Sequence, residues 1–183
     1  MNYIWSKKSL LEFIEKSIAK VVSEKDYKFS DLFAGTWIVW RYFKEKWHSV
    51  IANDLQYYSF VINKNYIENH KPLEFNGLFD IIEKLKDTEI LKRKDLVLNF
   101  LDSLKGKKWF IYKNYSVWWT KWQEHERMYF SDENAMKCDA IRTQIEDWKK
   151  SELVNENEYY FLLASLLENI DKVANTASVY WAF

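Results

Sequence analysis

The sequence predicts an α/β protein in which a parallel strand–helix–strand unit comes first and a mostly helical region follows. Apolar runs at residues 27–33 and 48–53 enclose a helical pattern at 38–46, and this order makes the two strands parallel. From Leu78 onward the apolar spacing is helical, in four segments that cover residues 78–86, 95–104, 133–150 and 156–173.

The same periodicity predicts the elements around this unit. Residues 9–24 carry apolar side chains at helical spacing, and Ser9 with Glu12 forms a capping-box start. Residues 55–69 continue as a helix that ends before Pro72, the one proline of the chain. Residues 107–121 form an interlude in which four lysines lie among aromatic side chains. Composition favours a surface loop there, although such side chains can also contact phosphates and stack on bases.

Composition limits the class of protein. A chain of 183 residues suits one domain of ordinary size, and its 27 basic and 27 acidic residues give no overall attraction to nucleic acid. Any contact with DNA is therefore expected from a local patch. The single cysteine, Cys138, excludes an internal disulfide, and the three histidines are too scattered for a metal site. With no signal-peptide pattern and no apolar run of membrane-spanning length, we expect a soluble cytoplasmic protein.

The turn from Asp31 to Thr36 closes the first apolar run and opens the helix that follows, and Asp54 ends the second run. A turn of small residues lets backbone N–H groups approach a ligand at a helix N-terminus. A carboxylate after the second strand can accept hydrogen bonds from ribose hydroxyls. The spacing therefore predicts a pocket for a nucleotide-type ligand.

Several blocks in order resemble the D12 class of DNA adenine-N6 methyltransferases, to which the Dam-like enzymes belong. Asn2–Lys7 resembles the family motif N-Y-I-G-S-K, and Asp31–Trp37 resembles D-L-F-A-G-T-G. Ile51–Asp54 is similar to the acidic end of the second strand of the family. Later blocks resemble one branch of the family at 127–130, 132–134, 139–142, 175–177 and 179–180.

The resemblance implies a Rossmann-like S-adenosylmethionine-dependent methyltransferase fold, present here as a partial sheet, with a mostly helical target-recognition insertion. Residues 1–75 would then form the N-terminal part of the cofactor-binding domain. Residues 76–174 would form the insertion that recognises DNA, and 175–183 the start of a return to the catalytic domain. The D-P-P-Y catalytic block of the family is absent from this sequence. The resemblance therefore implies a truncated enzyme that is inactive by itself.

The family assigns S-adenosyl-L-methionine as the cofactor and double-stranded DNA with a flipped adenine as the substrate. The protein partner would be a cognate restriction endonuclease, and the resemblance implies neither membrane binding nor a metal site. Lys7 would meet the methionine carboxylate and Asp54 the ribose. The expected cofactor contacts are Tyr3, Ser6, Lys7, Asp31, Phe33, Ala34, Gly35, Thr36, Asp54 and Leu55. The expected DNA contacts are Lys113, Tyr115, Lys121 and Arg127.

The number of tryptophans is unusual, because the chain has ten of them and only three glycines. Glycine at positions 37 and 40 would complete a G-x-G-x-x-G turn with Gly35. Trp47 follows a helix end, where a left-handed cap normally takes glycine. We expect an indole at position 40 to push the helix off the sheet, and one at position 37 to occupy cofactor space. Trp118 and Trp119 stand where a loop would take a glycine pair.

We hypothesise that most of these tryptophans come from UGA codons, which encode glycine in the source gene but were translated with a table in which UGA encodes tryptophan. Trp148, on a predicted helix, is the exception. UGG at codons 37 and 40 would contradict the hypothesis, and the alternative is a genuine aromatic surface that stacks on DNA. The positions concerned are Trp5, Trp37, Trp40, Trp47, Trp109, Trp118, Trp119, Trp122 and Trp181.

Two other functions remain open at this point. The chain could be a non-catalytic remnant that binds DNA or the cofactor, or a dinucleotide-binding oxidoreductase domain with the same glycine turn. The Asn2–Lys7 block argues against the oxidoreductase.

Overall fold

The computed structural model of the chain describes residues 7–24, 27–35 and 37–175. The chain divides into two compact units, Asn2–Glu68 and Asn69–Phe183, which we call the N-terminal and the C-terminal unit and describe separately. None of the helices described is long and apolar enough to cross a membrane.

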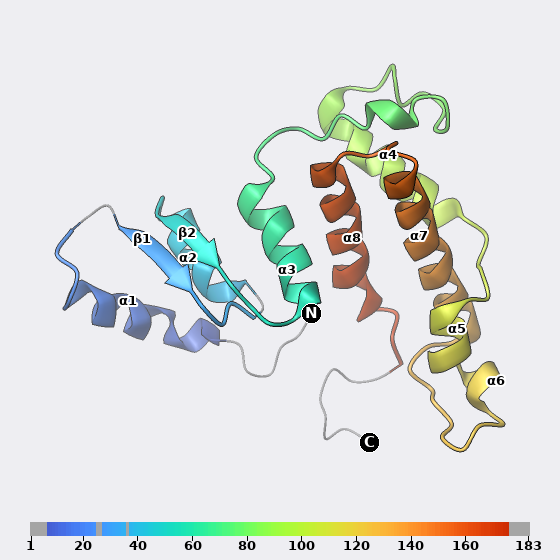
Figure 1. Cartoon of the computed structure of the whole chain (residues 1–183), viewed down its shortest axis with the longest axis horizontal. Coiled ribbons are helices and arrows are strands. Elements are labelled where there is room, and N and C mark those ends of the chain that lie inside the picture. Colours follow the sequence, from blue (N-terminus) through green and yellow to red (C-terminus); the bar gives the residue numbers. More distant parts are fainter. Residues whose placement is uncertain (1–6, 25–26, 36, 176–183) are drawn as a thin grey trace. The chain divides into compact units, whose positions relative to one another are not determined.

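The N-terminal unit contains a two-stranded parallel sheet with helices around it (Figure 1). The strands are β1 (Lys28–Asp31) and β2 (Ser49–Ala52), and they pair in parallel with Asp31 opposite Ala52. This confirms the predicted parallel strand–helix–strand order, although each strand is shorter than its apolar run. The helical elements are η1 (Lys7–Leu10), α1 (Leu11–Ala19), α2 (Ile38–Glu45), α3 (Tyr57–Asn63) and the π-helical η2 (Lys64–Glu68).

Helix α2 packs on the sheet through Phe43, which is fully buried and stacks on Phe29 of β1 with 4.0 Å between ring centroids. Its Lys44 ammonium donates to the carbonyls of Tyr66 at 2.6 Å and Ile67 at 2.8 Å, so α2 also holds η2. Burial lowers the pKa of Lys44. Helix α1 is tied to α2 because the Tyr42 hydroxyl donates to Glu15 at 2.5 Å.

The predicted helix over 9–24 is too long, since α1 ends at Ala19. The predicted helix over 55–69 also changes character, because its second half is the π-helical η2. These differences lie at element ends, where local periodicity is least decisive.

The C-terminal unit is helical, with α7 (Asp132–Lys150) and α8 (Glu156–Ile170) packed together (Figure 1). The other helices are η3 (Asn76–Leu78), α4 (Ile90–Ser103), α5 (Phe110–Tyr115) and α6 (Val117–Thr120). Trp148 of α7 is buried and stacks on Phe100 of α4 with 5.8 Å between centroids. Ser131 caps α7, and Asn155 with Glu158 forms a capping box that starts α8.

The predicted helix over 78–86 is wrong. Leu78, Ile82 and Leu85 are buried at the expected spacing, but the segment is a series of turns and Lys84 has a left-handed φ of 64°. The guanidinium of Arg93 of α4 donates to three carbonyls around this segment, those of Glu74 at 2.9 Å, Lys86 at 3.3 Å and Thr88 at 3.1 Å. These bonds satisfy backbone carbonyls before the turns and at their end, outside a helix.

The predicted surface loop over 107–121 is also wrong, since these residues contain α5 and α6. Trp118 and Trp119 therefore lie in a short helix and not in a loop that needs glycine.

The structure separates the other tryptophans into two groups. Trp37 and Trp47 have φ of 53° and 67°, the left-handed region that favours glycine. Trp40 behaves differently, because it is buried and its Nε1 donates to Asn63 Oδ1 on α3 at 2.8 Å. The expectation that an indole at position 40 pushes α2 off the sheet is wrong, since Phe43 of α2 still stacks on β1. Trp5 and Trp181 lie outside the described residues.

Candidate functional site

The carboxyl ends of β1 and β2 meet at one edge of the sheet, as parallel strands require, and hydrogen bonds join the loops that leave them. The Asn53 N–H donates to the Asp31 carbonyl at 2.8 Å, and the Ala34 N–H donates to the Asn53 carbonyl at 2.9 Å. The Asn53 side-chain amide donates to the Leu32 carbonyl at 3.1 Å. The turn after β1 is therefore held directly against the end of β2.

Asp54 joins the two loops a second time. Its Oδ2 accepts the Gly35 N–H at 2.8 Å, and its Oδ1 accepts the Gln56 N–H at 2.9 Å. Gly35 has a φ of 49°, a conformation that glycine adopts without strain, and its carbonyl accepts the Ser59 hydroxyl at 2.8 Å. The backbone around Gly35 is thus fixed from both sides.

Asp31 is the buried acid of this edge. Its side chain is 8% exposed, and its Oδ1 accepts the Phe33 N–H at 3.3 Å. Its Oδ2 has no hydrogen-bond partner within the described residues. Burial raises the pKa of Asp31, while the nearby Lys7 charge opposes that rise. A buried carboxylate oxygen without a partner is costly, so it indicates a group that a ligand can satisfy.

Lys7 reaches the same turn from the start of the chain. Its ammonium donates to the Phe33 carbonyl at 3.2 Å and remains largely exposed. The structure therefore brings four of the expected cofactor residues together, namely Lys7, Asp31, Gly35 and Asp54.

The other expected cofactor residues lie differently. Ala34 is buried beneath the turn, whereas Phe33 and Leu55 are 80% and 99% exposed. Tyr3, Ser6 and Thr36 lie outside the described residues. A cavity of about 350 Å³ adjoins β2 and α3; Asn53 and Asp54 line it, but the Asp31–Gly35 turn does not.

These residues fit a nucleoside cofactor. Asp31 offers a carboxylate oxygen that has no partner among the described residues, Asp54 offers a carboxylate at the end of β2, and Lys7 offers a cation. Trp37, which was expected to occupy cofactor space, contacts the Tyr66 ring edge-on with 5.7 Å between centroids.

Sequence reasoning missed two residues that build this edge, Asn53 and Ser59. In the sequence, Asn53 stands out only as the residue before Asp54, and Ser59 only as part of the predicted helix over 55–69. A signal existed for Ser59, because Ser59 and Asn63 lie four residues apart and so share one face of the predicted helix, where the structure buries both and the Asn63 amide donates to the Ser59 hydroxyl at 3.4 Å.

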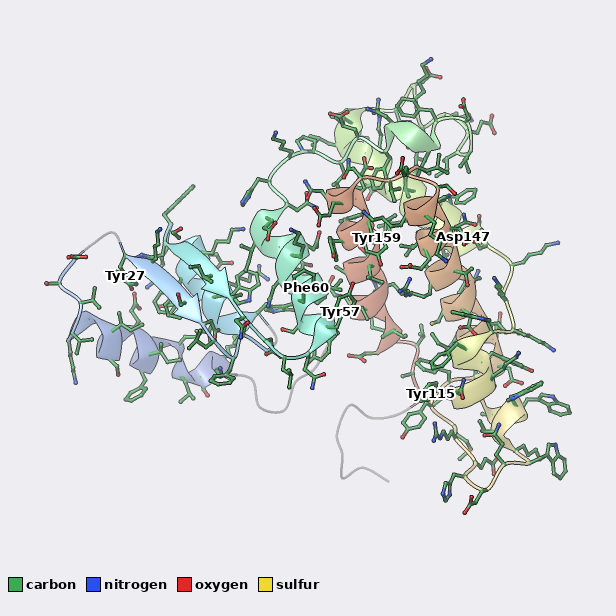
Figure 2. The ribbon with its side chains drawn as sticks, viewed as in Figure 1. Tyr27, Tyr57, Phe60, Tyr115, Asp147 and Tyr159 are labelled. Carbon is green, nitrogen blue, oxygen red and sulfur yellow. The ribbon has the colours of Figure 1, made fainter. Side chains whose placement is uncertain are left out.

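The expected DNA contacts lie in the C-terminal unit, on α5, α6 and the loop up to residue 127. We call residues 105–127 the basic–aromatic segment; it contains six lysines and arginines but only two glutamates. Its cations lie over aromatic rings, with Lys113 5.8 Å from the Trp119 centroid, and Arg127 5.5 Å from the centroid of Tyr115, which Figure 2 labels. Lys108 and Lys121 make the same type of contact with Tyr112 and Trp122.

The cations of this segment are available to an anion. None of Lys113, Lys121 and Arg127 forms an ion pair within the part of the chain that the structure describes. Trp118 and Trp122 are 59% and 83% exposed beside them. Unpaired cations next to exposed rings are the side chains that contact phosphates and stack on bases.

Comparison with known proteins supports the resemblance that the sequence blocks show. The profile of the D12 class N6 adenine-specific DNA methyltransferases matches residues 3–183. The chain is 47% identical over 185 residues to the type II methyltransferase M.NlaIII of Neisseria lactamica and covers 49% of that protein. It is 39% identical to the type II methyltransferase M.CviAII of Paramecium bursaria Chlorella virus 1, again covering 49%. It is 36% identical to the modification methylase StsI of Streptococcus sanguinis and covers 26% of it.

The whole chain is aligned in each comparison, but it spans only about half or a quarter of the relatives it matches. No solved structure shows a significant match. The family match extends over both units, from the turn after β1 to the helices that carry the basic–aromatic segment. The chain belongs to the family of D12 class N6 adenine-specific DNA methyltransferases.

Proposed function

We propose that this chain is the cofactor-binding and DNA-contacting part of an enzyme that methylates N6 of adenine in DNA. The observation that carries the proposal is the joined edge of β1 and β2, where Asp31, Gly35 and Asp54 come together beside Lys7. Ligands of α/β sheets bind at the carboxyl ends of parallel strands, and this edge is of that type. We therefore assign the N-terminal unit to a Rossmann-like methyltransferase sheet.

S-adenosyl-L-methionine is the proposed cofactor, and it supplies the methyl group as a sulfonium. Lys7 would hold its methionine carboxylate, and Asp54 would accept hydrogen bonds from its ribose. Asp31 would accept a hydrogen bond from the bound molecule through Oδ2, which none of the residues described here contacts by a hydrogen bond. Tyr3, Ser6, Phe33, Ala34, Thr36 and Leu55 complete the proposed pocket.

Double-stranded DNA is the proposed substrate of the C-terminal unit, with the target adenine flipped out of the base stack. Lys113, Lys121 and Arg127 would contact phosphates, and Tyr115 would support Arg127. The named relatives are type II methyltransferases and modification methylases, which favours a cognate restriction endonuclease as the partner.

The transfer step itself needs residues that this sequence does not contain. The family block D-P-P-Y holds the adenine amino group, and the 183 residues have a single proline, Pro72. The proposed role of these residues is therefore to bind the cofactor and DNA.

Calorimetric titration tests the cofactor site. S-adenosylmethionine should bind the chain, and Asp54→Asn should weaken binding about tenfold, because it removes a charged acceptor. Glu12→Gln is the matched control, since Glu12 is an exposed acid on α1 with 83% of its side chain accessible. Binding of NAD without binding of S-adenosylmethionine would favour the oxidoreductase and contradict the proposal.

Fluorescence anisotropy with a labelled duplex tests the DNA site. Replacing Lys113, Lys121 and Arg127 together by Ala should weaken binding and flatten the salt dependence by about 0.9 per lost phosphate contact. The matched control replaces Lys84, Lys86 and Lys92, three exposed cations outside the basic–aromatic segment, by Ala. Equal loss in both triple variants would show that only net charge matters, and the proposed segment would then be wrong.

A further inference from the structure

Asp139 joins α7 to the start of α5. It is fully buried, and its carboxylate accepts the N–H groups of Trp109 at 3.1 Å, Ile111 at 2.9 Å and Tyr112 at 2.8 Å. The first N–H groups of a helix have no partner within it, so a helix needs a cap. Here the cap comes from a residue 27 to 30 positions further along the chain.

Asp132, at the first turn of α7, does the same for α6, since its Oδ1 accepts the Trp118 N–H at 3.0 Å. The buried Thr120 hydroxyl accepts the Arg127 N–H at 2.8 Å and donates to the Ser116 carbonyl at 2.7 Å. The loop that carries Arg127 is thereby closed against α6. The basic–aromatic segment is thus fixed to α7 at two carboxylates.

An uncompensated carboxylate beside the basic–aromatic segment would repel the phosphates of DNA. Asp139 is fully buried and surrounded by three N–H donors, so its charge is compensated inside the protein. Two cations of the segment, Lys113 and Arg127, lie over aromatic rings and form no ion pair among the described residues. The acids therefore orient the segment without neutralising its cations.

We infer that Asp139 and Asp132 are positioning residues for DNA binding, which set α5 and α6 so that the basic–aromatic segment meets the duplex as a preformed surface. This inference rests on the proposed DNA-contacting role of that segment. A preformed surface binds more tightly than a loop that must be ordered on contact, because the cost of ordering side chains and backbone is met during folding.

The experiment compares Asp139→Asn and Asp132→Asn with Asp147→Asn in the full chain. Asp147 is an exposed acid on the same helix, and Figure 2 places it toward the end of α7 away from Tyr115. All three variants lose one negative charge. That change alone should strengthen binding to DNA slightly, so any weakening has the opposite sign. Circular dichroism first establishes that each variant is folded.

Anisotropy over a salt series with the labelled duplex then gives affinity and slope. Asp139→Asn should bind DNA about tenfold more weakly than Asp147→Asn. Its slope of log affinity against log salt should be smaller by about 0.9, which corresponds to one phosphate contact. Asp132→Asn, which loses one bond to α6, should show a smaller change in the same direction. If Asp139→Asn does not fold, Asp132→Asn decides alone.

If Asp139→Asn folds and has the same affinity and salt slope as Asp147→Asn, the inference is overturned. If Asp139→Asn does not fold, the inference is overturned when Asp132→Asn has the same affinity and salt slope as Asp147→Asn. Failure of the proposed function looks different. In that case the triple Ala variant of Lys113, Lys121 and Arg127 binds like wild type. If the triple variant loses binding but the two Asn variants do not, the inference alone is wrong.

Discussion

Trp47 combines a left-handed backbone with an almost fully exposed side chain. Its φ is 67°, and the residue is 95% exposed. The left-handed conformation costs a residue with a Cβ roughly 1–2 kcal/mol, and the exposed indole returns little by burial. Trp47 follows α2 as glycine does after many helices, so the position is suited to glycine.

Trp47→Gly should therefore raise the free energy of unfolding by about 1 kcal/mol. Trp122→Gly is the control, because Trp122 is 83% exposed but is not among the residues with positive φ. Urea unfolding followed by circular dichroism measures both. A loss of stability in Trp47→Gly, equal to that in Trp122→Gly, would contradict the prediction.

The glycine hypothesis now differs from position to position. Trp37 shares the left-handed conformation of Trp47, whereas Trp40 is buried with its Nε1 bonded to Asn63. Trp40→Gly should therefore be strongly destabilising here, by about 3–5 kcal/mol for a lost buried indole. Sequencing of the coding DNA at codons 37, 40 and 47 tests the UGA hypothesis, which stays a prediction.

Asp31 should make stability depend on pH in the direction opposite to most acids. Burial raises the pKa of Asp31 above its ordinary value of 3.8, with Lys7 opposing and Asp54 adding to the rise. The folded state therefore binds the proton more tightly than the unfolded state. Its contribution to stability is present below the ordinary pKa and is lost as pH rises through the folded pKa.

Asp31→Asn should accordingly be more stable than wild type at neutral pH, and the difference should vanish as the solution is acidified below the ordinary carboxyl pKa. Urea unfolding at a series of pH values measures it, with Glu12→Gln as the control at an exposed acid on α1. The same substitution should weaken binding of S-adenosylmethionine. A variant less stable than wild type at neutral pH would show that the buried carboxylate stabilises the fold.

Among the elements, η3 and the irregular segment that follows it depend on a close backbone contact at Gly77. A Cβ on Gly77 would lie 2.3 Å from the Leu153 carbonyl oxygen, which belongs to the turn between α7 and α8. Backbone atoms cannot swing aside as the tip of a side chain can. The glycine is therefore required by the approach of two chain segments.

Gly77→Ala should lower the free energy of unfolding by about 1–3 kcal/mol, the usual range for overpacking. Asp80→Ala, an exposed position in the same segment, should change it by less than about 0.5 kcal/mol. Thermal unfolding of the two variants provides the comparison. Similar midpoints would mean that the turn at Leu153 shifts without cost.

The elements that the sequence predicts well are those whose determinants are local. Helix α7 has Ser131 as its cap, and α2 lies between two apolar runs that form strands. Residues 78–86 have helical spacing, but the backbone leaves the helical path at Lys84, whose φ of 64° the apolar spacing does not indicate. For α5, the decisive cap is Asp139, which no window of sequence around residue 110 contains.

The candidate site shows the same division. Asp31, Gly35 and Asp54 could be placed together because parallel strands bring their carboxyl ends to one edge. The unpaired Oδ2 of Asp31 and the bond from Ser59 to Gly35 depend on packing, and no spacing rule gives them. For Asp139 there was a signal, since the acid lies four residues after Ala135 on the buried face of α7 and so needs partners.

For the whole molecule, the attraction to DNA is expected to come from one segment and not from the net charge. The chain has no net charge, so the six cations of the basic–aromatic segment, and not the protein as a body, are expected to attract DNA. With about 0.9 per phosphate contact, the slope of log affinity against log salt should not exceed roughly five. The proposed cofactor site lies in the N-terminal unit and the proposed DNA segment in the C-terminal unit.

Since the two proposed sites use no common residue, substitutions in them should act independently in this chain. Asp54→Asn should leave the affinity for DNA unchanged, and Lys121→Ala should leave the affinity for S-adenosylmethionine unchanged. For each ligand, the double variant should show the same loss of affinity as the single variant that affects that ligand, within about 0.5 kcal/mol. Calorimetry with the cofactor and anisotropy with the duplex, on wild type, both single variants and the double variant, complete the cycle. A larger interaction energy would show that cofactor and DNA binding are coupled within these residues.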